Sequence, residues 1–325
     1  MEYNRKNARR WSIMGERPTF GLALHEFAKE NEDILAVVAD IVGSAGLERF
    51  RTEMPDRIIN VGIAEQNMMG VATGLASEGY TVFTTSFAPF QTMRCLDQIR
   101  VNQGYMGQKL IMAGLAAGAA YGELGFTHCT IEDVSIMRSI PNIAVVTPAD
   151  CMEVVKAVET AITYEQSVYI RLLDKTNVPI VYSDDYHFEI GKAVRLADGN
   201  AIAVLANGTM VAPSLRAAEK LLEETGTRVA VFDFHTIKPL DVELLKQIEA
   251  SFQCVLTVEE HSLIGGLGSA VSEYYSESRN RLPVYKMGMP DAYPHGASHE
   301  TLLSELGLTE EGICDKIKTI MEELS

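Results

Sequence analysis

The most constraining feature of this sequence is the alternation of short apolar runs, rich in valine and isoleucine, with longer stretches of helical period. In the first half the apolar runs fall at 34–39, 81–84, 109–113, 143–146 and 168–171. The helical stretches between them fall at 63–77, 87–102, 131–138 and 150–164. Such alternation is typical of a mostly parallel sheet covered by helices, because parallel strands need long crossover connections. The sequence therefore predicts an α/β fold.

The same alternation resumes after a break in the middle of the chain. Residues 172–190 contain Pro179 and lose the periodicity, which is typical of a linker. Beyond it, strands are expected at 201–206, 228–232 and 254–258, and helices at 211–224, 241–250 and 268–276. Asp241 follows a proline and stands where a helix N-cap belongs. We predict two α/β domains with mostly parallel sheets, over residues 1–185 and 186–325.

The charge balance excludes two classes of partner. Lys plus Arg number 28 and Asp plus Glu number 44, which leaves a formal net charge of -16. A chain this acidic repels a phosphate backbone or an anionic membrane surface over most of its area, so neither nucleic acid nor membrane is an expected partner. A small anionic substrate would need local arginines, which directs attention to Arg17 and Arg171.

Cysteine usage and the N-terminus indicate the compartment. The chain has 5 cysteines, far apart and without a CxxC pair, so neither a disulfide framework nor a structural zinc site is expected. Residues 1–11 are basic but no apolar stretch follows them, and no apolar run reaches the ~18 residues of a membrane span. We expect a cytoplasmic protein whose N-terminus is a flexible or partner-contacting arm.

The most informative segment is 56–79, DRIINVGIAEQNMMGVATGLASEG. A short apolar strand runs through a glycine into a helix that carries Glu65 in its first turn. An acid at this position is commonplace, because it complements the exposed amides and the dipole of the helix. Position alone therefore favours a structural role for Glu65.

A longer match changes that interpretation. VGIAEQNM followed by GVATGLASEGY resembles the pyrimidine-domain motif of transketolases, and TSFAPFQTMRCLDQIR and GELGFTHCTIEDVSIMRSIPN resemble the segments that follow it in that family. The match continues through TPAD, YIR, TIKPLD and VEEHSLIGGLGSAVSE, so that it covers nearly the whole chain. The resemblance implies a thiamine-diphosphate pyrimidine-binding domain followed by a transketolase C-terminal domain.

The resemblance implies roles for four residues toward thiamine diphosphate. Glu65 matches the glutamate that contacts N1′ of the aminopyrimidine, where proton exchange activates the cofactor. Phe87 and Phe90 match the aromatic residues that pack on the aminopyrimidine, although two aromatics three apart on a helix are also a common core pattern. Asp40, in VVADIVGSAG, matches an acid near the thiazolium, or it caps the turn that follows.

Four further positions match substrate contacts of the family. His128 matches a histidine that approaches the substrate hydroxyls and assists proton movements, so we predict a catalytic as well as a substrate-binding role; a lone histidine is otherwise usually structural. Arg17, Ser44 and Arg171 match positions that hold the anionic tail of a sugar phosphate, and the alternative for the arginines is surface ion pairing. His235, His261, His295 and His299 of the second unit are expected to be structural.

Two departures from the family concern the substrate. Where many transketolases read GEDG this chain has Leu124, so a carboxylate that contacts a substrate hydroxyl is missing. Residues 113–122 contain no histidine, whereas the family has one there near the charged end of the substrate. We therefore expect a branched, deoxygenated or differently charged ketose rather than the common xylulose and ribose phosphates.

The largest departure is the absence of a GDG motif with a downstream Asn, which in these enzymes carries magnesium and the diphosphate. The nearest look-alike, 198–200, opens a strand of the second unit and lacks that arrangement. We therefore expect no metal ligand in this chain. Mg²⁺ and the diphosphate would be held by a separate N-terminal transketolase subunit, in an α2β2 heterotetramer with sites between chains.

The sequence thus predicts one subunit of a split transketolase, which moves a two-carbon ketol unit from an anionic ketose to an aldose. The nearest rival is a 2-oxoacid dehydrogenase E1 β subunit, which has a similar length and similar domains. Deoxyxylulose-phosphate synthase is a further relative, but its chains hold all domains together. A non-catalytic assembly subunit is the alternative from another class, and the intact Glu65 and Phe87 argue against it.

Overall fold

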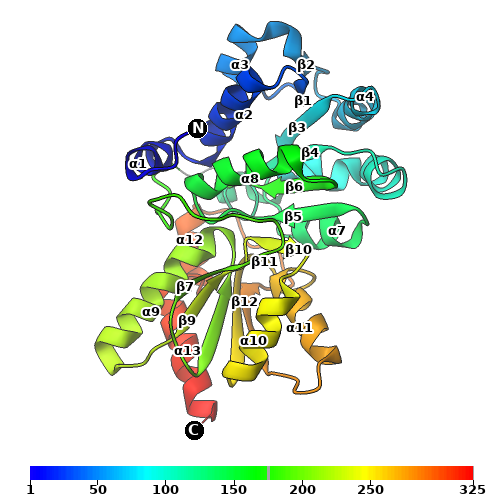
Figure 1. Cartoon of the computed structure of the whole chain (residues 1–325). Helices are drawn as coiled ribbons and strands as arrows, with labels where there is room; N and C mark the ends of the chain where they lie inside the picture. Colours follow the sequence, from blue (N-terminus) through cyan, green and yellow to red (C-terminus); the bar gives the residue numbers. More distant parts are fainter. Residues whose placement is uncertain (174–175, 325) are drawn as a thin grey trace.

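The computed structural model describes residues 1–173 and 176–324, so two positions of the predicted linker, 174 and 175, lie outside the described residues. The chain forms two lobes, each built on a sheet with helices packed on it (Figure 1). This arrangement confirms the predicted α/β class with two mostly parallel sheets. The predicted boundary between residues 185 and 186 stays a prediction.

The first sheet has seven strands in the order β10-β5-β6-β4-β3-β1-β2. All of its neighbouring pairs are parallel except β10 with β5. Its strands are β1 Ile34–Val38, β2 Ile58–Asn60, β3 Thr81–Phe87, β4 Ile111–Leu115, β5 Ile143–Val146, β6 Ser167–Arg171 and β10 Thr236–Lys238. Because β10 comes from the second half of the chain, it ties that half to the first sheet.

The second sheet has five strands in the order β12-β11-β8-β9-β7, with only the β7 to β9 pair antiparallel. Its strands are β7 Val194–Ala197, β8 Ile202–Ala206, β9 Ala230–Asp233, β11 Cys254–Ser262 and β12 Val284–Met289. Strands β8, β9 and β11 are buried along their whole length, as strands covered by helices on both faces should be.

Helices cover both sheets. Those of the first half are α1 Arg5–Met14, α2 Glu16–Glu30, α3 Glu48–Glu53, α4 Glu65–Ser77, α5 Ala88–Gln91, α6 Leu96–Ile99, α7 Asp133–Ser139 and α8 Cys151–Thr163. Those of the second half are α9 Val211–Thr225, α10 Val242–Ser251, α11 Leu267–Glu277, α12 His299–Glu305 and α13 Glu310–Leu324. The Asp241 side chain accepts a hydrogen bond from the backbone of Leu244 at 3.1 Å, which confirms the predicted N-cap of α10.

Two expectations about helices are wrong. The basic N-terminus is not a flexible arm: residues 5–14 form α1, whose Trp11 is 2% exposed. The large apolar residues, and not the charges, determine how this segment packs, because Trp11 reaches the core cluster between α2 and α8.

The helix expected at 87–102 is divided into α5, a 3₁₀ turn, α6 and a π-helical segment over Arg100–Tyr105. This division aims Phe90 and Arg94 toward the carboxyl edge of the sheet.

A buried carboxyl near the lobe junction gives a testable pH dependence. Glu16 opens α2; one of its oxygens accepts from the backbone of Leu173 at 2.5 Å and the other has no partner. Burial raises the pKa of Glu16 from 4.5 to about 8, and burial likewise raises that of Glu259 to about 7. Between pH 4.5 and 8 the folded chain therefore keeps protons that the unfolded chain has released. The free energy of unfolding should fall as pH rises through this window.

Urea unfolding at pH 5 and pH 8 measures this fall. Glu16→Gln should flatten it, because glutamine keeps the hydrogen bond to Leu173 without a proton to release. Glu32→Gln, at an exposed carboxyl, is the matched control and should leave the fall unchanged. An identical pH dependence in Glu16→Gln and the native chain would contradict the assignment.

No helix within the described ranges is long and apolar enough to cross a membrane.

Candidate active site

The predicted cofactor residues lie at the carboxyl edge of the first sheet. Asp40 follows β1, Glu65 follows β2 through a short turn, and Phe87 ends β3. The carboxyl edge is where open parallel sheets bind ligands, because the loops that leave the strands converge there. The topology thus brings together residues that are far apart in the sequence.

Glu65 is the first residue of α4 and is only 4% exposed. The turn before it is fixed by Asn60, whose side-chain oxygen accepts from the backbone of Gly62 and of Asp40, both at 3.0 Å. Gly62 has a φ of 74°, a conformation that favours glycine. The Glu65 carboxylate accepts a charge-assisted hydrogen bond of 2.8 Å from Nη1 of Arg94. A buried carboxylate at a helix N-terminus, next to one cation, is well placed to bind a nitrogen heterocycle.

Four rings form a continuous cluster beside this carboxylate. The Phe87 ring centroid lies 6.2 Å from that of Phe90, 5.6 Å from that of Tyr121 and 5.8 Å from that of His128. Phe90 and His128 are 5.5 Å apart, and all of these pairs are edge-to-face. The four side chains are partly exposed, so they form the wall of an open site and not a closed core.

Arginines stand at both ends of the ring cluster. The Arg94 guanidinium lies 3.8 Å from the Phe90 centroid, and that of Arg17 lies 5.8 Å from the Tyr121 centroid. Contacts between neighbouring side chains therefore run from Glu65 through Arg94 and the rings to Arg17, from the predicted cofactor end to the predicted anion end. Arg94 and Tyr121 were not singled out from the sequence; Arg94 lies in a segment that carries the family resemblance, and Tyr121 directly precedes another.

The loop after β1 packs against Arg17. A Cβ on Gly46 would stand 2.8 Å from the backbone oxygen of Arg17, so this close approach requires glycine. Ser44 lies exposed on the same loop, and Asp40 at its start is exposed with a φ of 58°. The side chain of Asn60 donates to Asp40 at 3.3 Å, which links this loop to the turn before Glu65.

Arg171 has different surroundings from the other predicted residues. It is 4% exposed, and its Nε donates to Asp133 at 2.8 Å while Nη2 donates to the backbone oxygen of Glu260 at 3.0 Å. Asp133 is fully buried and also accepts from the Tyr169 hydroxyl at 2.7 Å. This placement argues against the predicted contact of Arg171 with a substrate anion, because its guanidinium already serves to join the two lobes.

The loop that carries the substrate departures is exposed beside the ring cluster. Leu124 is 56% exposed on the 3₁₀ turns of Gly122–Thr127, and Nδ1 of His128 lies 3.0 Å from the Thr127 hydroxyl. Residues of the second lobe pack on this loop: Tyr293 contacts Phe126 with ring centroids 4.4 Å apart. Leu124 therefore presents an apolar surface where the family has a carboxylate.

The histidines of the second half have structural surroundings in three cases. Burial lowers the pKa of His235 to about 3 and that of His261 to about 4, so both are neutral near pH 7. His299 lies 2.9 Å from the Glu260 carboxylate at the lobe junction. His295 lies on the surface, 3.6 Å from Glu305.

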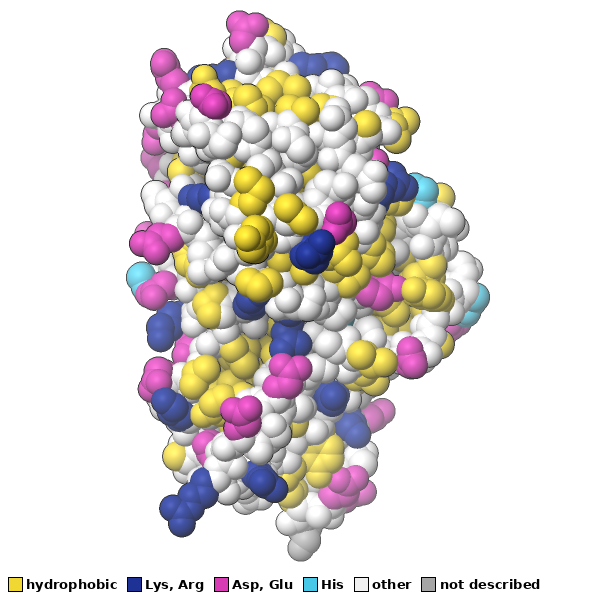
Figure 2. All heavy atoms as spheres, turned by 90° about the vertical axis from the view of Figure 1, so that its right-hand side faces the viewer, with side chains coloured by type: hydrophobic (Ala, Val, Ile, Leu, Met, Phe, Trp, Pro, Cys, Tyr) yellow, Lys and Arg dark blue, Asp and Glu magenta, His cyan; other side chains and the backbone are white. Residues whose placement is uncertain are grey.

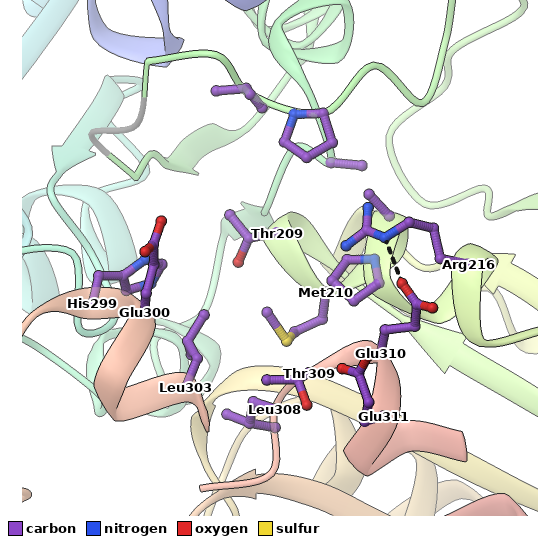
Figure 3. A pocket seen from close by; sticks show the side chains of 15 residues that line it. Thr209, Met210, Arg216, His299, Glu300, Leu303, Leu308, Thr309, Glu310 and Glu311 are labelled. Carbon is purple, nitrogen blue, oxygen red and sulfur yellow. Dashed lines mark hydrogen bonds and ion pairs between the residues drawn. The ribbon is translucent and has the colours of Figure 1, made fainter. Parts of the chain in front are cut away.

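A separate cavity of about 280 Å³ lies between the lobes (Figure 3). Its walls carry Met210, Leu303 and Leu308, and the ion pair of Arg216 with Glu310 at 3.1 Å crosses one side. None of the eight residues predicted from the sequence lines this cavity. We therefore take the ring cluster at the sheet edge, and not this cavity, as the candidate site.

Comparison with known proteins gives the family of both halves of the chain. Residues 15–179 match the family described as transketolase, pyrimidine binding domain, and residues 191–313 match transketolase, C-terminal domain. The chain belongs to the transketolase family. Glu65, the ring cluster and Arg17 all lie within the match to the pyrimidine-binding domain.

Relatives that match over nearly their whole length indicate which kind of transketolase chain this one resembles. The chain is 38% identical to one of the subunits of the apulose-4-phosphate transketolase of Phocaeicola vulgatus, over 94% of this chain and 96% of that protein. It is also 38% identical to the SqwH subunit of the 6-deoxy-6-sulfo-D-fructose transketolase of Clostridium sp., over 91% of each chain. A solved split gene transketolase, described as an inactive beta4 tetramer, superposes with a TM-score of 0.84 at 38% identity, covering 94% of this chain and 97% of that one. These relatives favour the transketolase hypothesis over the dehydrogenase E1 β subunit.

Proposed function

We propose that this chain is the pyrimidine-binding subunit of a split transketolase that uses thiamine diphosphate. The observation that carries the proposal is the buried Glu65 carboxylate beside the Phe87 and Phe90 rings, in a chain of the same length as transketolase subunits. With its partner subunit the enzyme transfers a two-carbon ketol unit from a ketose to an aldose.

The residues present fit the aminopyrimidine half of the cofactor. Glu65 offers a carboxyl shielded from water, and the faces of Phe87 and Phe90 offer an apolar surface for a flat ring. When bound, thiamine diphosphate supplies the nucleophilic carbon that accepts the two-carbon unit. Glu65 would hold and exchange a proton at N1′, and Asp40 would stand beside the thiazolium.

The same residues suggest how this chain handles the substrate. His128, packed against both phenylalanines, moves a proton at a substrate hydroxyl. Arg17 and Ser44, on adjoining segments, bind an anionic group at the far end of the sugar. Arg171 is left out of this proposal because it is buried and its Nε and Nη2 already donate within the chain.

The metal half of the site is proposed to come from the partner. Within the described residues, no group of three or more His, Cys, Asp or Glu side chains is arranged to hold a metal ion. The residues present therefore fit the aminopyrimidine but not the magnesium diphosphate. We assign Mg²⁺ and the diphosphate to an N-terminal transketolase subunit in an α2β2 heterotetramer.

Exposed apolar side chains on the helical segments that follow β2 and β3 support this assembly. Ile63 is 79% exposed, Tyr105 88% and Met106 56%, and Met93 and Val101 are also exposed. They lie on or beside α4, α6 and the π-helical segment, which pack against one another. Hydrophobic side chains gather on the face that includes α4 and α7 (Figure 2). Contiguous exposed apolar surface is typical of a protein interface.

The proposed substrate is an anionic sugar other than the common pentose phosphates. The relatives act, by their names, on apulose 4-phosphate and on 6-deoxy-6-sulfo-D-fructose. Here Leu124 and the lack of a histidine in 113–122 remove two polar contacts, which favours a ketose with a missing or displaced hydroxyl or another anionic group. A xylulose 5-phosphate turnover equal to that of such a ketose would contradict this part of the proposal.

Reconstitution tests the function. The purified chain should not bind thiamine diphosphate and Mg²⁺ tightly by itself, whereas its complex with the diphosphate-binding subunit should bind both and transfer a ketol unit. Tight binding by the chain alone would overturn the split-site proposal. Oxidative decarboxylation of a 2-oxoacid by the complex, with transfer to a lipoyl carrier, would favour the E1 β alternative instead.

A further inference from the structure

The Arg94 guanidinium occupies two features that the cofactor would need free, the Glu65 carboxylate and a face of the Phe90 ring. Nη1 of Arg94 donates to Oε1 of Glu65 at 2.8 Å, while the same guanidinium lies 3.8 Å from the Phe90 ring centroid. The aminopyrimidine, by the proposed function, requires the same carboxyl and an aromatic face of the same cluster. One planar group therefore already uses both features of the site.

A guanidinium resembles an aminopyrimidine in the properties that matter here. Both are flat and both stack on an aromatic ring. The guanidinium donates in its plane to a carboxylate, and N1′ of the aminopyrimidine shares a proton with a carboxyl in the same plane once one proton has been taken up from water. A carboxylate with 5% of its side chain exposed is costly to leave unpaired, so some donor must satisfy it before the cofactor arrives. Arg94 supplies that donor.

We propose that Arg94 holds the place of the aminopyrimidine until the cofactor displaces it. This inference rests on the proposed function. Arg94 can leave because its side chain is 43% exposed, so the guanidinium reaches water by rotating about its own bonds. Its backbone stays in place, since Gln66 donates to the Arg94 carbonyl at 3.1 Å. Loading of the site thus replaces the guanidinium by the ring, with one proton taken up from solvent and shared between Glu65 and N1′.

The proposal predicts that Arg94 opposes cofactor binding. In the reconstituted complex, Arg94→Met should bind thiamine diphosphate with Mg²⁺ about tenfold more tightly than the native complex, because no ion pair has to break. Arg94→Lys should lie between them, since lysine keeps the charge but cannot stack as a plane. The dissociation constants are measured by isothermal titration calorimetry, without reference to turnover.

A matched control separates this local effect from the loss of a positive charge. Arg100→Met removes the same charge from a neighbouring segment, where the arginine is 61% exposed and pairs with Asp97 at 2.8 Å. Because the cofactor carries a diphosphate, loss of a cation alone should leave binding unchanged or weaken it slightly. Arg100→Met should behave in this way while Arg94→Met binds more tightly.

The melting temperature of the complex without cofactor tests whether Arg94 satisfies Glu65 in that state. Arg94→Met leaves Glu65 without its partner, so the complex should melt at a lower temperature than the native complex, and thiamine diphosphate should narrow that difference. Equal or weaker cofactor binding by Arg94→Met would overturn the inference and make Arg94 a residue that supports the ring. A native complex that shows no saturable binding at all would instead overturn the proposed function.

Discussion

Glu65→Gln in the reconstituted complex should lower kcat by about 10²–10⁴-fold, the range that a positioned acid or base contributes. Glutamine has nearly the same shape and keeps a hydrogen-bonding oxygen for Arg94, but it cannot exchange a proton with N1′. The complex should still assemble, because Glu65 is 4% exposed and contributes almost nothing to the surface. Single-turnover kinetics, with gel filtration of the same sample, measures both results.

Glu78→Gln is the matched control, since Glu78 follows the last turn of the same helix and is exposed. It should change kcat by less than about twofold. Unchanged turnover in Glu65→Gln would support the alternative of a non-catalytic assembly subunit that keeps the family fold. Loss of assembly in Glu65→Gln would instead show that the carboxylate is needed for folding.

The sequence predicts the buried parts of the fold well, because burial leaves a strong apolar pattern. Strands such as Ile202–Ala206 and the helix Glu65–Ser77 are found close to their expected bounds. Edge strands were missed: Val194–Ala197 and Val284–Met289 stand at the two edges of the second sheet, each paired on one side only. Such strands form because they pair with a neighbouring strand. Pairing between distant segments leaves no local period in the sequence, so the sequence does not reveal these strands.

In the candidate site, too, some features could be predicted from the sequence and others could not. Residue types and order suffice to group Glu65, Phe87, Phe90 and His128, because each matches a motif and all follow strands of one parallel sheet. The contacts of Arg94 could not be predicted, since they depend on the break in the helix expected at 87–102. A resemblance to a family indicates which residue occupies a given place in the fold. It does not indicate which side chain that residue contacts, because the contacts depend on the local packing.

Arg171→Met should lower the free energy of unfolding by about 3–5 kcal/mol, the usual effect of removing one member of a buried ion pair. Asp133 would then be a fully buried carboxylate that keeps the Tyr169 hydroxyl, at 2.7 Å, as its side-chain donor. Urea unfolding of the chain measures the change. Arg49→Met, which breaks an exposed pair with Glu53, is the control and should leave the urea midpoint nearly unchanged, because solvent screens an exposed pair.

The double variant Arg171→Met with Asp133→Asn decides between the two roles considered for Arg171. It removes both charges, so part of the lost stability should return, and the complex can then be assayed with a sugar phosphate. If Arg171 only joins the lobes, the KM of the double variant should stay within about twofold of the native value. A KM raised by about tenfold or more, with kcat unchanged, would restore Arg171 as an anion contact, because loss of binding common to the ground and transition states raises KM alone.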